Sequence, residues 1–212
     1  MIGLPNQSIQ NIKESLNKVI TLNPEHISVY SLILEEGTKL YQKYENKEIE
    51  LPDEELERNM YWYVKNTLEN NGYNHYEISN FSKKGYESKH NMNCWKQKEY
   101  IGFGLNAHSY VDGARYSNTE VLEEYIKGSN KIIHEKQTME DMKKEYMLLG
   151  LRKIEGISIQ KFEEKFVENP IFLFRNELNK LVEQDLLEVD GDIIRLTNKG
   201  LDLANIVWQE FV

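Results

Sequence analysis

The opening segment of the chain most constrains the fold, because it reads as a strand end, a helix and a second strand. "MIGLP" (residues 1–5) is typical of the end of a buried strand followed by a turn. Ser8 can cap the helix that follows. Four apolar residues then recur at helical spacing: Ile9, Ile12, Leu16 and Val19. "HISVYSLIL" (residues 26–34) is an apolar, β-branched run that predicts a strand.

A strand, a helix and a strand at this spacing form a βαβ unit, in which the two strands run parallel. Parallel strands belong to larger sheets, so an α/β fold with further strands is expected. Because no strand stands upstream of Met1, we expect the N-terminus to be the cut edge of a larger parallel domain. An unpaired apolar edge favours pairing with a second copy, so we also expect a homodimer.

The middle of the chain is predicted to alternate helices and strands. Asp53 can cap a helix that Gly72 ends. Residues 73–81 alternate like a strand, and residues 82–93 read as a polar loop. An Asp112-Gly113 pair then predicts a hairpin turn. These elements complete a first domain over residues 1–137.

A second domain, over residues 138–212, has the element order of a winged helix. Three helices are expected there, over residues 139–151, 159–167 and 171–184. They are followed by a hairpin that turns at Asp190-Gly191 and by a helix that Thr197 caps. The whole chain is therefore expected to be α/β, or α+β overall, with a small winged-helix-like domain at the C-terminus.

Charge and composition exclude several classes of function. The formal net charge is −9, and residues 138–212 hold ten Lys and Arg against fifteen Asp and Glu. Nucleic-acid binding needs a basic face, so the winged-helix-like domain is not expected to bind DNA. The chain has no apolar run of membrane-spanning length and no secretory signal pattern. A cytoplasmic protein is the expectation.

His90 and Cys94, the single cysteine of the chain, stand four residues apart. On a helix they would share a face, where an imidazole and a thiolate could bind zinc or act as a nucleophilic pair. Zinc would need two further ligands, and a buried cysteine that packs as a small apolar residue is the commoner case. His90 alone fits either an axial ligand of haem iron or a hydrogen-bonding loop histidine. The residues alone leave these alternatives open.

The glycine-rich stretch "GFGLNAHS" (residues 102–109) is a weaker signal. Paired glycines can let a phosphate or a planar ligand approach the backbone closely. A tight turn into a buried strand is the simpler interpretation, and it makes His108 a hydrogen-bonded core histidine.

"HISVYSLILEEGTKLY" (residues 26–41) resembles the sixth-strand region of a known family, the HemW-like radical SAM proteins, which are related to oxygen-independent coproporphyrinogen III oxidase. "GYNHYEISNFSKKGYESKHNMNCWKQKEYIGFGLNAHSY" is similar to its patterns Tyr-Glu-Ile-Ser-Asn-Phe, His-Asn-x-x-Tyr-Trp and Tyr-x-Gly-x-Gly-x-x-Ala-His-Ser. The tail, from "LRKIEGISIQKFEEKF" to "NIVWQEFV", resembles its C-terminal winged-helix-like domain. Together these stretches cover nearly the whole chain.

The resemblance implies the C-terminal part of an incomplete (β/α) radical SAM barrel with a β extension, followed by the winged-helix-like domain. It implies a haem chaperone that binds haem and delivers it to acceptor proteins. An alternative is a portion of a coproporphyrinogen III oxidase of porphyrin biosynthesis. A further alternative is a module in which residues 138–212 dock a partner and no ligand binds.

The resemblance also assigns residues. His90, Asn91 and Trp95 match the haem-associated motif, with His90 as the ligand of the haem iron and Tyr100 as aromatic support. Cys94 stands where the motif has tyrosine. No catalytic residue is assigned.

In the family, S-adenosylmethionine and a [4Fe-4S] cluster are bound mainly through motifs upstream of the strand that ends in Gly-Leu-Pro. Met1 and Ile33 match barrel positions near the adenosine, as remnants of that pocket. One cysteine cannot hold a cluster, so no iron–sulfur ligand is assigned and this chain alone is expected to lack radical chemistry.

Overall fold

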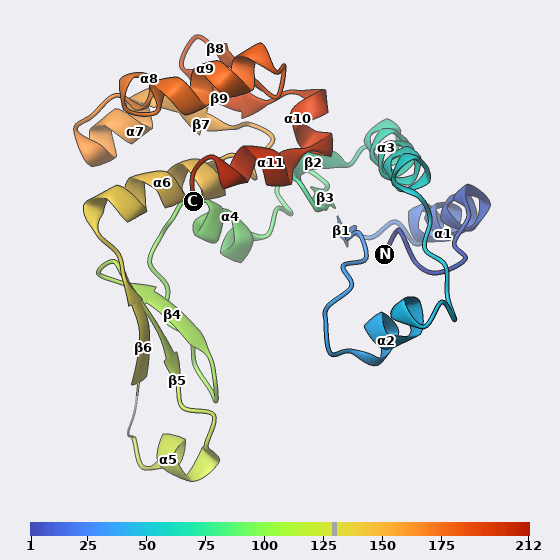
Figure 1. Cartoon of the computed structure of the whole chain (residues 1–212), viewed down its shortest axis with the longest axis horizontal. Coiled ribbons are helices and arrows are strands. Elements are labelled where there is room, and N and C mark those ends of the chain that lie inside the picture. Colours follow the sequence, from blue (N-terminus) through green and yellow to red (C-terminus); the bar gives the residue numbers. More distant parts are fainter. Residues whose placement is uncertain (129–130) are drawn as a thin grey trace. The chain divides into compact units, whose positions relative to one another are not determined.

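The computed structural model describes residues 1–128 and 131–212 (Figure 1). The chain divides into two compact units, an N-terminal unit of residues 1–87 and a C-terminal unit of residues 88–212. The mixture of helices and strands confirms the expected α/β class, and no closed barrel forms within the described ranges. The boundary predicted at residues 137 and 138 falls inside the C-terminal unit and stays a prediction.

The N-terminal unit packs two helices on a small sheet. Its elements in chain order are α1 (Ile9–Leu22), β1 (His26–Ser28), α2 (Lys39–Glu45), α3 (Glu54–Asn70), β2 (Asn74–Glu77) and β3 (Asn80–Ser82). Helices α1 and α3 pack against each other. The caps are as predicted, since Ser8 Oγ accepts from Asn11 N at 3.3 Å and Asp53 Oδ1 accepts from Leu56 N at 2.7 Å. The core includes Leu16, Met60, Val64, Leu68 and Phe81.

The predicted parallel pair is reduced to a single bridge between Ile2 and Ser31. Ile2 N donates to Tyr30 O and Leu32 N donates to Ile2 O, both at 2.9 Å. The strand expected over residues 26–34 was too long, because only residues 26–28 find a continuous ladder. That ladder is antiparallel, in a sheet of order β1-β3-β2.

The strand expected over residues 73–81 is two strands, β2 and β3, joined by a turn at residues 78–79. The side chain of Asn80 donates to the carboxylate of Glu77 across this turn, and both residues are buried. A turn without glycine or proline leaves the apolar alternation intact, which is why the pattern reads as one strand.

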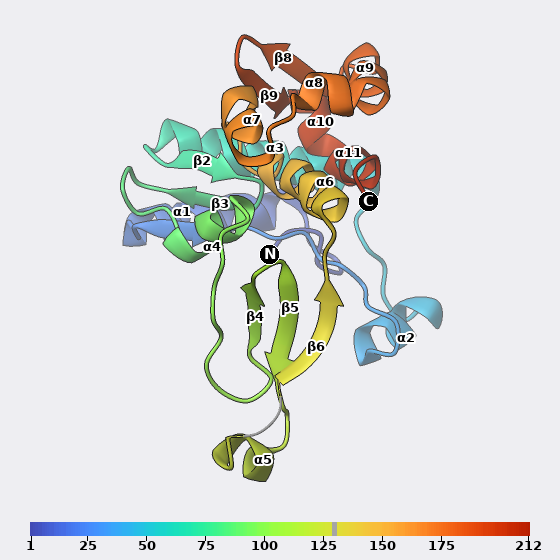
Figure 2. The same cartoon turned by 90° about the vertical axis from the view of Figure 1, so that its left-hand side faces the viewer.

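The first part of the C-terminal unit is a short helix followed by a three-stranded antiparallel sheet. Its elements are α4 (Lys89–Trp95), β4 (His108–Val111), β5 (Ala114–Asn118), α5 (Leu122–Ile126) and β6 (Lys131–Lys136). Strands β4, β5 and β6 lie side by side in that order (Figure 2). The hairpin at Asp112-Gly113 is confirmed, with both residues at positive φ. The loop expected over residues 82–93 is wrong in its second half, because Ser88 caps a helix from Lys89 onward.

The last part of the C-terminal unit confirms the winged-helix order. Its elements are α6 (Met139–Gly150), β7 (Ile157–Ser158), α7 (Ile159–Phe166), α8 (Pro170–Leu173), α9 (Arg175–Glu183), β8 (Leu187–Asp190), β9 (Ile193–Leu196), α10 (Asn198–Asp202) and α11 (Ala204–Gln209). The helix expected over residues 171–184 is split at Phe174, which is buried in the core. The wing turns one residue later than predicted, at Gly191-Asp192, because Asp190 pairs with Ile193. Thr197 caps α10 as expected.

Candidate functional site

The haem-associated motif lies on helix α4, at the start of the C-terminal unit. Ser88 Oγ accepts a hydrogen bond from Asn91 N at 3.3 Å and so begins the helix. This cap places His90 in the first turn, where it is exposed, while Asn91 is half-buried. The imidazole is therefore accessible to a ligand from solvent.

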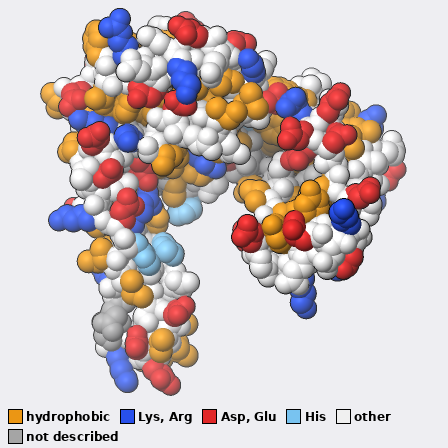
Figure 3. Space-filling view, in the orientation of Figure 1, with side chains coloured by type: hydrophobic (Ala, Val, Ile, Leu, Met, Phe, Trp, Pro, Cys, Tyr) orange, Lys and Arg blue, Asp and Glu red, His pale blue; other side chains and the backbone are white. Residues whose placement is uncertain are grey.

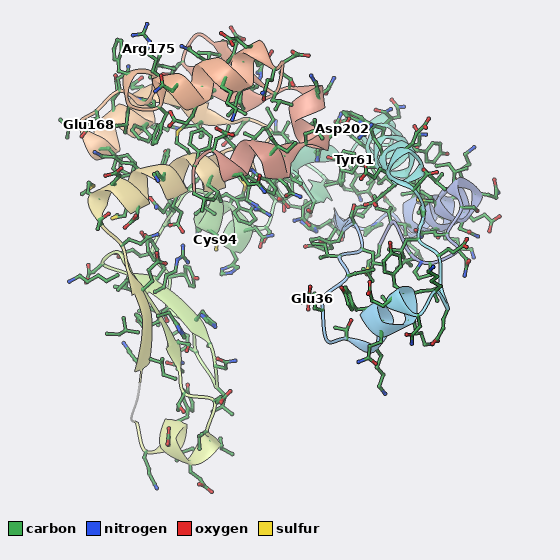
Figure 4. The ribbon with its side chains drawn as sticks, viewed as in Figure 1. Glu36, Tyr61, Cys94, Glu168, Arg175 and Asp202 are labelled. Atoms are coloured by element: carbon green, nitrogen blue, oxygen red, sulfur yellow. The ribbon has the colours of Figure 1, made fainter. Side chains whose placement is uncertain are left out.

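His90, Cys94 and Tyr100 come together on one side of α4. The Nε2 atom of His90 lies 3.8 Å from Cys94 Sγ, as the spacing of four residues on a helix predicts. The ring of Tyr100 meets the ring of His90 edge to face, with centroids 5.9 Å apart. Figure 4 labels Cys94 on this helix. Burial raises the pKa of the Cys94 thiol against the opposing charge of Arg115, so the thiol form prevails at neutral pH.

The β4–β6 sheet fixes Tyr100. Its backbone exchanges two hydrogen bonds with Tyr110, at 2.9 and 3.0 Å. The guanidinium of Arg115 lies 4.9 Å from the centroid of the Tyr110 ring and forms an ion pair with Glu145 of α6. Tyr100 is therefore supported by a buried tyrosine and a paired arginine, and its own ring stays half-buried beside His90.

Trp95 lies on a different side of α4 from His90. Five residues along a helix correspond to a rotation of about 140° past one full turn. The Trp95 ring centroid is 4.7 Å from the guanidinium carbon of Arg152, and its Nε1 atom is buried. The sequence pointed to Trp95 but not to Arg152, which lies 57 positions later and carries no local signal of this contact.

The glycine-rich stretch has a packing role. A Cβ at Gly102 would lie 2.3 Å from the carbonyl oxygen of His108, so only glycine fits there. Gly102 N donates to Ser109 Oγ at 3.0 Å, and the side chain of Asn118 donates to the carbonyls of Gly102 and Gly104. These contacts favour the tight-turn interpretation over a ligand-binding loop.

The expectation that His108 is a core histidine is wrong. His108 is exposed and stacks on His134, with ring centroids 5.3 Å apart. His134 Nε2 is 2.8 Å from Oγ of the buried Ser117, which anchors the exposed pair of rings to β5. Histidine side chains are visible on this surface in Figure 3. The spacing could not show the pair, because β6 was not predicted.

Met1 and Ile33 lie in the N-terminal unit, beside the bridge between Ile2 and Ser31. Both side chains are exposed. The part of the chain that the structure describes holds no group of three or more metal-ligating side chains. With one cysteine, the residues do not fit a [4Fe-4S] cluster. A haem iron, in contrast, needs a single accessible imidazole from the protein on one face.

Comparisons with known proteins find matches named HemN or HemW. Residues 137–203 match the family model described as the HemN C-terminal domain. The chain is 37% identical to the heme chaperone HemW of Lactococcus lactis, over 99% of this chain and 56% of that protein. It is 39% identical to the heme chaperone HemW of Bacillus subtilis, over 100% of this chain and 57% of that protein. The chain thus spans about half the length of the curated relatives it matches.

A solved structure shares the fold. Coproporphyrinogen III oxidase (HemN) from Escherichia coli, described as a radical SAM enzyme, matches with a TM-score of 0.77 over 99% of this chain and 53% of that one. The two sequences are 18% identical, so this likeness concerns the fold alone. Within the described ranges, no helix combines the length and the apolar character that crossing a membrane requires.

Proposed function

This chain belongs to the HemW-like family, and we propose that it forms the haem-binding portion of a haem chaperone that passes haem to acceptor proteins. The observation that carries the proposal is the exposed imidazole of His90 in the first turn of α4, with the Tyr100 ring edge against it. A neutral imidazole is a standard axial ligand of haem iron, and aromatic rings suit the porphyrin plane. The L. lactis and B. subtilis relatives carry the same function in their names.

In this proposal each residue of the motif has a separate task. His90 would supply an imidazole nitrogen to the haem iron, and Tyr100 would offer an aromatic edge beside it. Asn91 lies in the first turn, where its backbone N–H donates to the capping hydroxyl of Ser88. Cys94 stays a neutral thiol beside the imidazole. Trp95 stabilises the far end of the helix through Arg152.

The proposal assigns no radical step to these residues. S-Adenosylmethionine and an iron–sulfur cluster would supply that chemistry in longer members of the family, and Met1 and Ile33 remain the proposed adenosine contacts. A homodimer through the exposed residues beside Ile2 also remains a proposal. Its test is light scattering across a range of protein concentrations.

Titration of the purified chain with haem tests the function. We expect a Soret band, and we expect His90→Ala to weaken haem binding about tenfold or more, because the iron loses its protein ligand. His108→Ala and His134→Ala are matched controls, since both remove exposed imidazoles from the same unit. An unchanged spectrum in His90→Ala, or an equal loss in His108→Ala, would contradict the assignment of His90.

A further inference from the structure

At the C-terminal end of α4, the side chain of an arginine contacts the rings of two tryptophans. The guanidinium carbon of Arg152, just after α6, lies 4.7 Å from the Trp95 ring centroid and 4.2 Å from the Trp208 ring centroid. Trp208 belongs to α11. A guanidinium at these distances from indole rings is attracted by their π faces, most strongly where water is excluded. Both indole Nε1 atoms and the Nε atom of Arg152 are buried, while each of the three residues is half-buried as a whole.

A second contact holds the residue that follows the helix by two positions. Gln97 is 5% exposed and adopts a left-handed backbone conformation, with φ of 50°. Its Nε2 atom donates to Met142 O at 3.0 Å and to Glu145 Oε2 at 2.9 Å. Its Oε1 atom accepts from Lys165 Nζ at 2.8 Å. One side chain thus joins the end of α4 to α6 and to α7.

These contacts matter because α4 is short. A helix of seven residues is not stable by itself, so its tertiary contacts set its direction. The contacts of Trp95 and Gln97 leave the side with His90, Cys94 and Tyr100 open. Removing them would leave α4 anchored mainly at its first turn.

We propose that Arg152 and Gln97 are positioning residues, through which the winged-helix-like region holds α4 so that His90 and Tyr100 face the same haem. This inference rests on the proposed function. It gives residues 138–212 a defined task in a chain whose charge argues against DNA binding. Trp95 then serves the haem site through Arg152 and Trp208, from the side of the helix that faces away from His90.

The test compares Arg152→Ala with Arg152→Lys and with Arg175→Ala in the full chain. Arg175 lies exposed on α9 (labelled in Figure 4) and makes a matched control for the loss of an arginine. We expect Arg152→Ala to weaken haem binding about tenfold and to lower the share of imidazole-ligated iron in the resonance Raman spectrum. Arg152→Lys keeps a cation between the two indole rings, so it should recover part of the haem affinity and part of the imidazole-ligated iron. Arg175→Ala should match the parent protein.

Amide hydrogen exchange of the haem-free protein separates this inference from the proposed function. Exchange at residues 89–95 should be about tenfold faster in Arg152→Ala, whether or not haem binds the parent chain. If haem fails to bind while exchange at residues 89–95 accelerates as expected, the proposed function is wrong but the positioning role of Arg152 is supported. If a folded Arg152→Ala protein shows parental exchange at α4 and parental haem affinity, the inference that Arg152 positions α4 is wrong. Should Arg152→Ala not fold, Trp208→Phe, which keeps a weaker π face, decides by the same two measurements.

Discussion

Residues 76–81 bury Glu77, Asn80 and Phe81, whereas residues 90–95 carry an exposed histidine at the surface of a helix. In the first stretch, Glu77 is 2% exposed and Phe81 is 0% exposed, and the ring of Phe81 stacks on His75 with centroids 4.4 Å apart. In the second, His90 is exposed and meets Cys94 and Tyr100. Both stretches carry the family resemblance, yet their physical environments differ.

A recognisable motif does not by itself mark a binding site. The stretch "YEISNF" builds a hairpin, in which Asn80 bonds to Glu77 and Tyr76 Oη lies 2.8 Å from His26 Nε2. The stretch "HNMNCW" builds a helix with one side for a ligand and another for packing. A buried motif is therefore expected to govern stability, and an exposed one to govern binding.

The largest change in stability is expected for a substitution of Phe81. Phe81→Ala should lower the free energy of unfolding of the N-terminal unit by about 3–5 kcal/mol, because it leaves a cavity in a closed core. Urea denaturation measures it. Phe103→Ala is the matched control, since Phe103 is 87% exposed, and its change should stay within about 0.5 kcal/mol. Equal losses in both variants would show that the burial described for residues 76–81 does not determine stability.

A smaller effect is expected from pH at His75. Burial lowers the pKa of His75 below its ordinary value, because the charged imidazole is desolvated beside Phe81. The unfolded chain then takes up the proton more readily, so stability falls as the pH drops below about 6.5 and levels off below the folded-state pKa. Urea midpoints at pH 7.5 and pH 5.5 should differ less in His75→Gln than in the parent protein. An equal difference between the two midpoints in His75→Gln and in the parent protein would count against this account.

The smallest effect is expected at Cys94. Burial raises the pKa of the Cys94 thiol, so the thiol stays protonated at neutral pH. Cys94→Ser should therefore leave the Soret band of the haem complex unchanged. Stability should change by no more than about 0.5 kcal/mol, since the side chain is only partly buried. A shifted Soret band in this variant would identify the sulfur, and not the imidazole, as the iron ligand.

Much of the fold could be predicted because local chemistry determines it. Ser8, Asp53 and Thr197 each cap a helix where the spacing places them. The Asp112-Gly113 turn required positive φ at both positions, and those residues tolerate it. Where one residue type satisfies a local backbone requirement, such as a helix cap or a positive φ, the sequence is sufficient to predict the element.

The remainder depends on contacts between distant residues. The turn at residues 78–79 depends on the pairing of β3 with both β1 and β2. The sequence predicts a loop for the first part of α4 because its polar residues give no apolar period, whereas the contacts at its C-terminal end come from Arg152 and, through Gln97, from Met142, far along the chain. The assignment of His90 comes from the resemblance and stays a prediction, whereas its neighbours in space, such as Arg152 beside Trp95, carry no local signal in the sequence.

The division of the chain at residues 87 and 88 has a consequence for how the site could work. Helix α4 begins at Lys89, and every contact described for it comes from residues 88–212. The Ser88 cap, Tyr100 and the Arg152 contact of Trp95 therefore all belong to residues 88–212. A substitution confined to residues 1–87 would leave every one of these contacts of α4 in place.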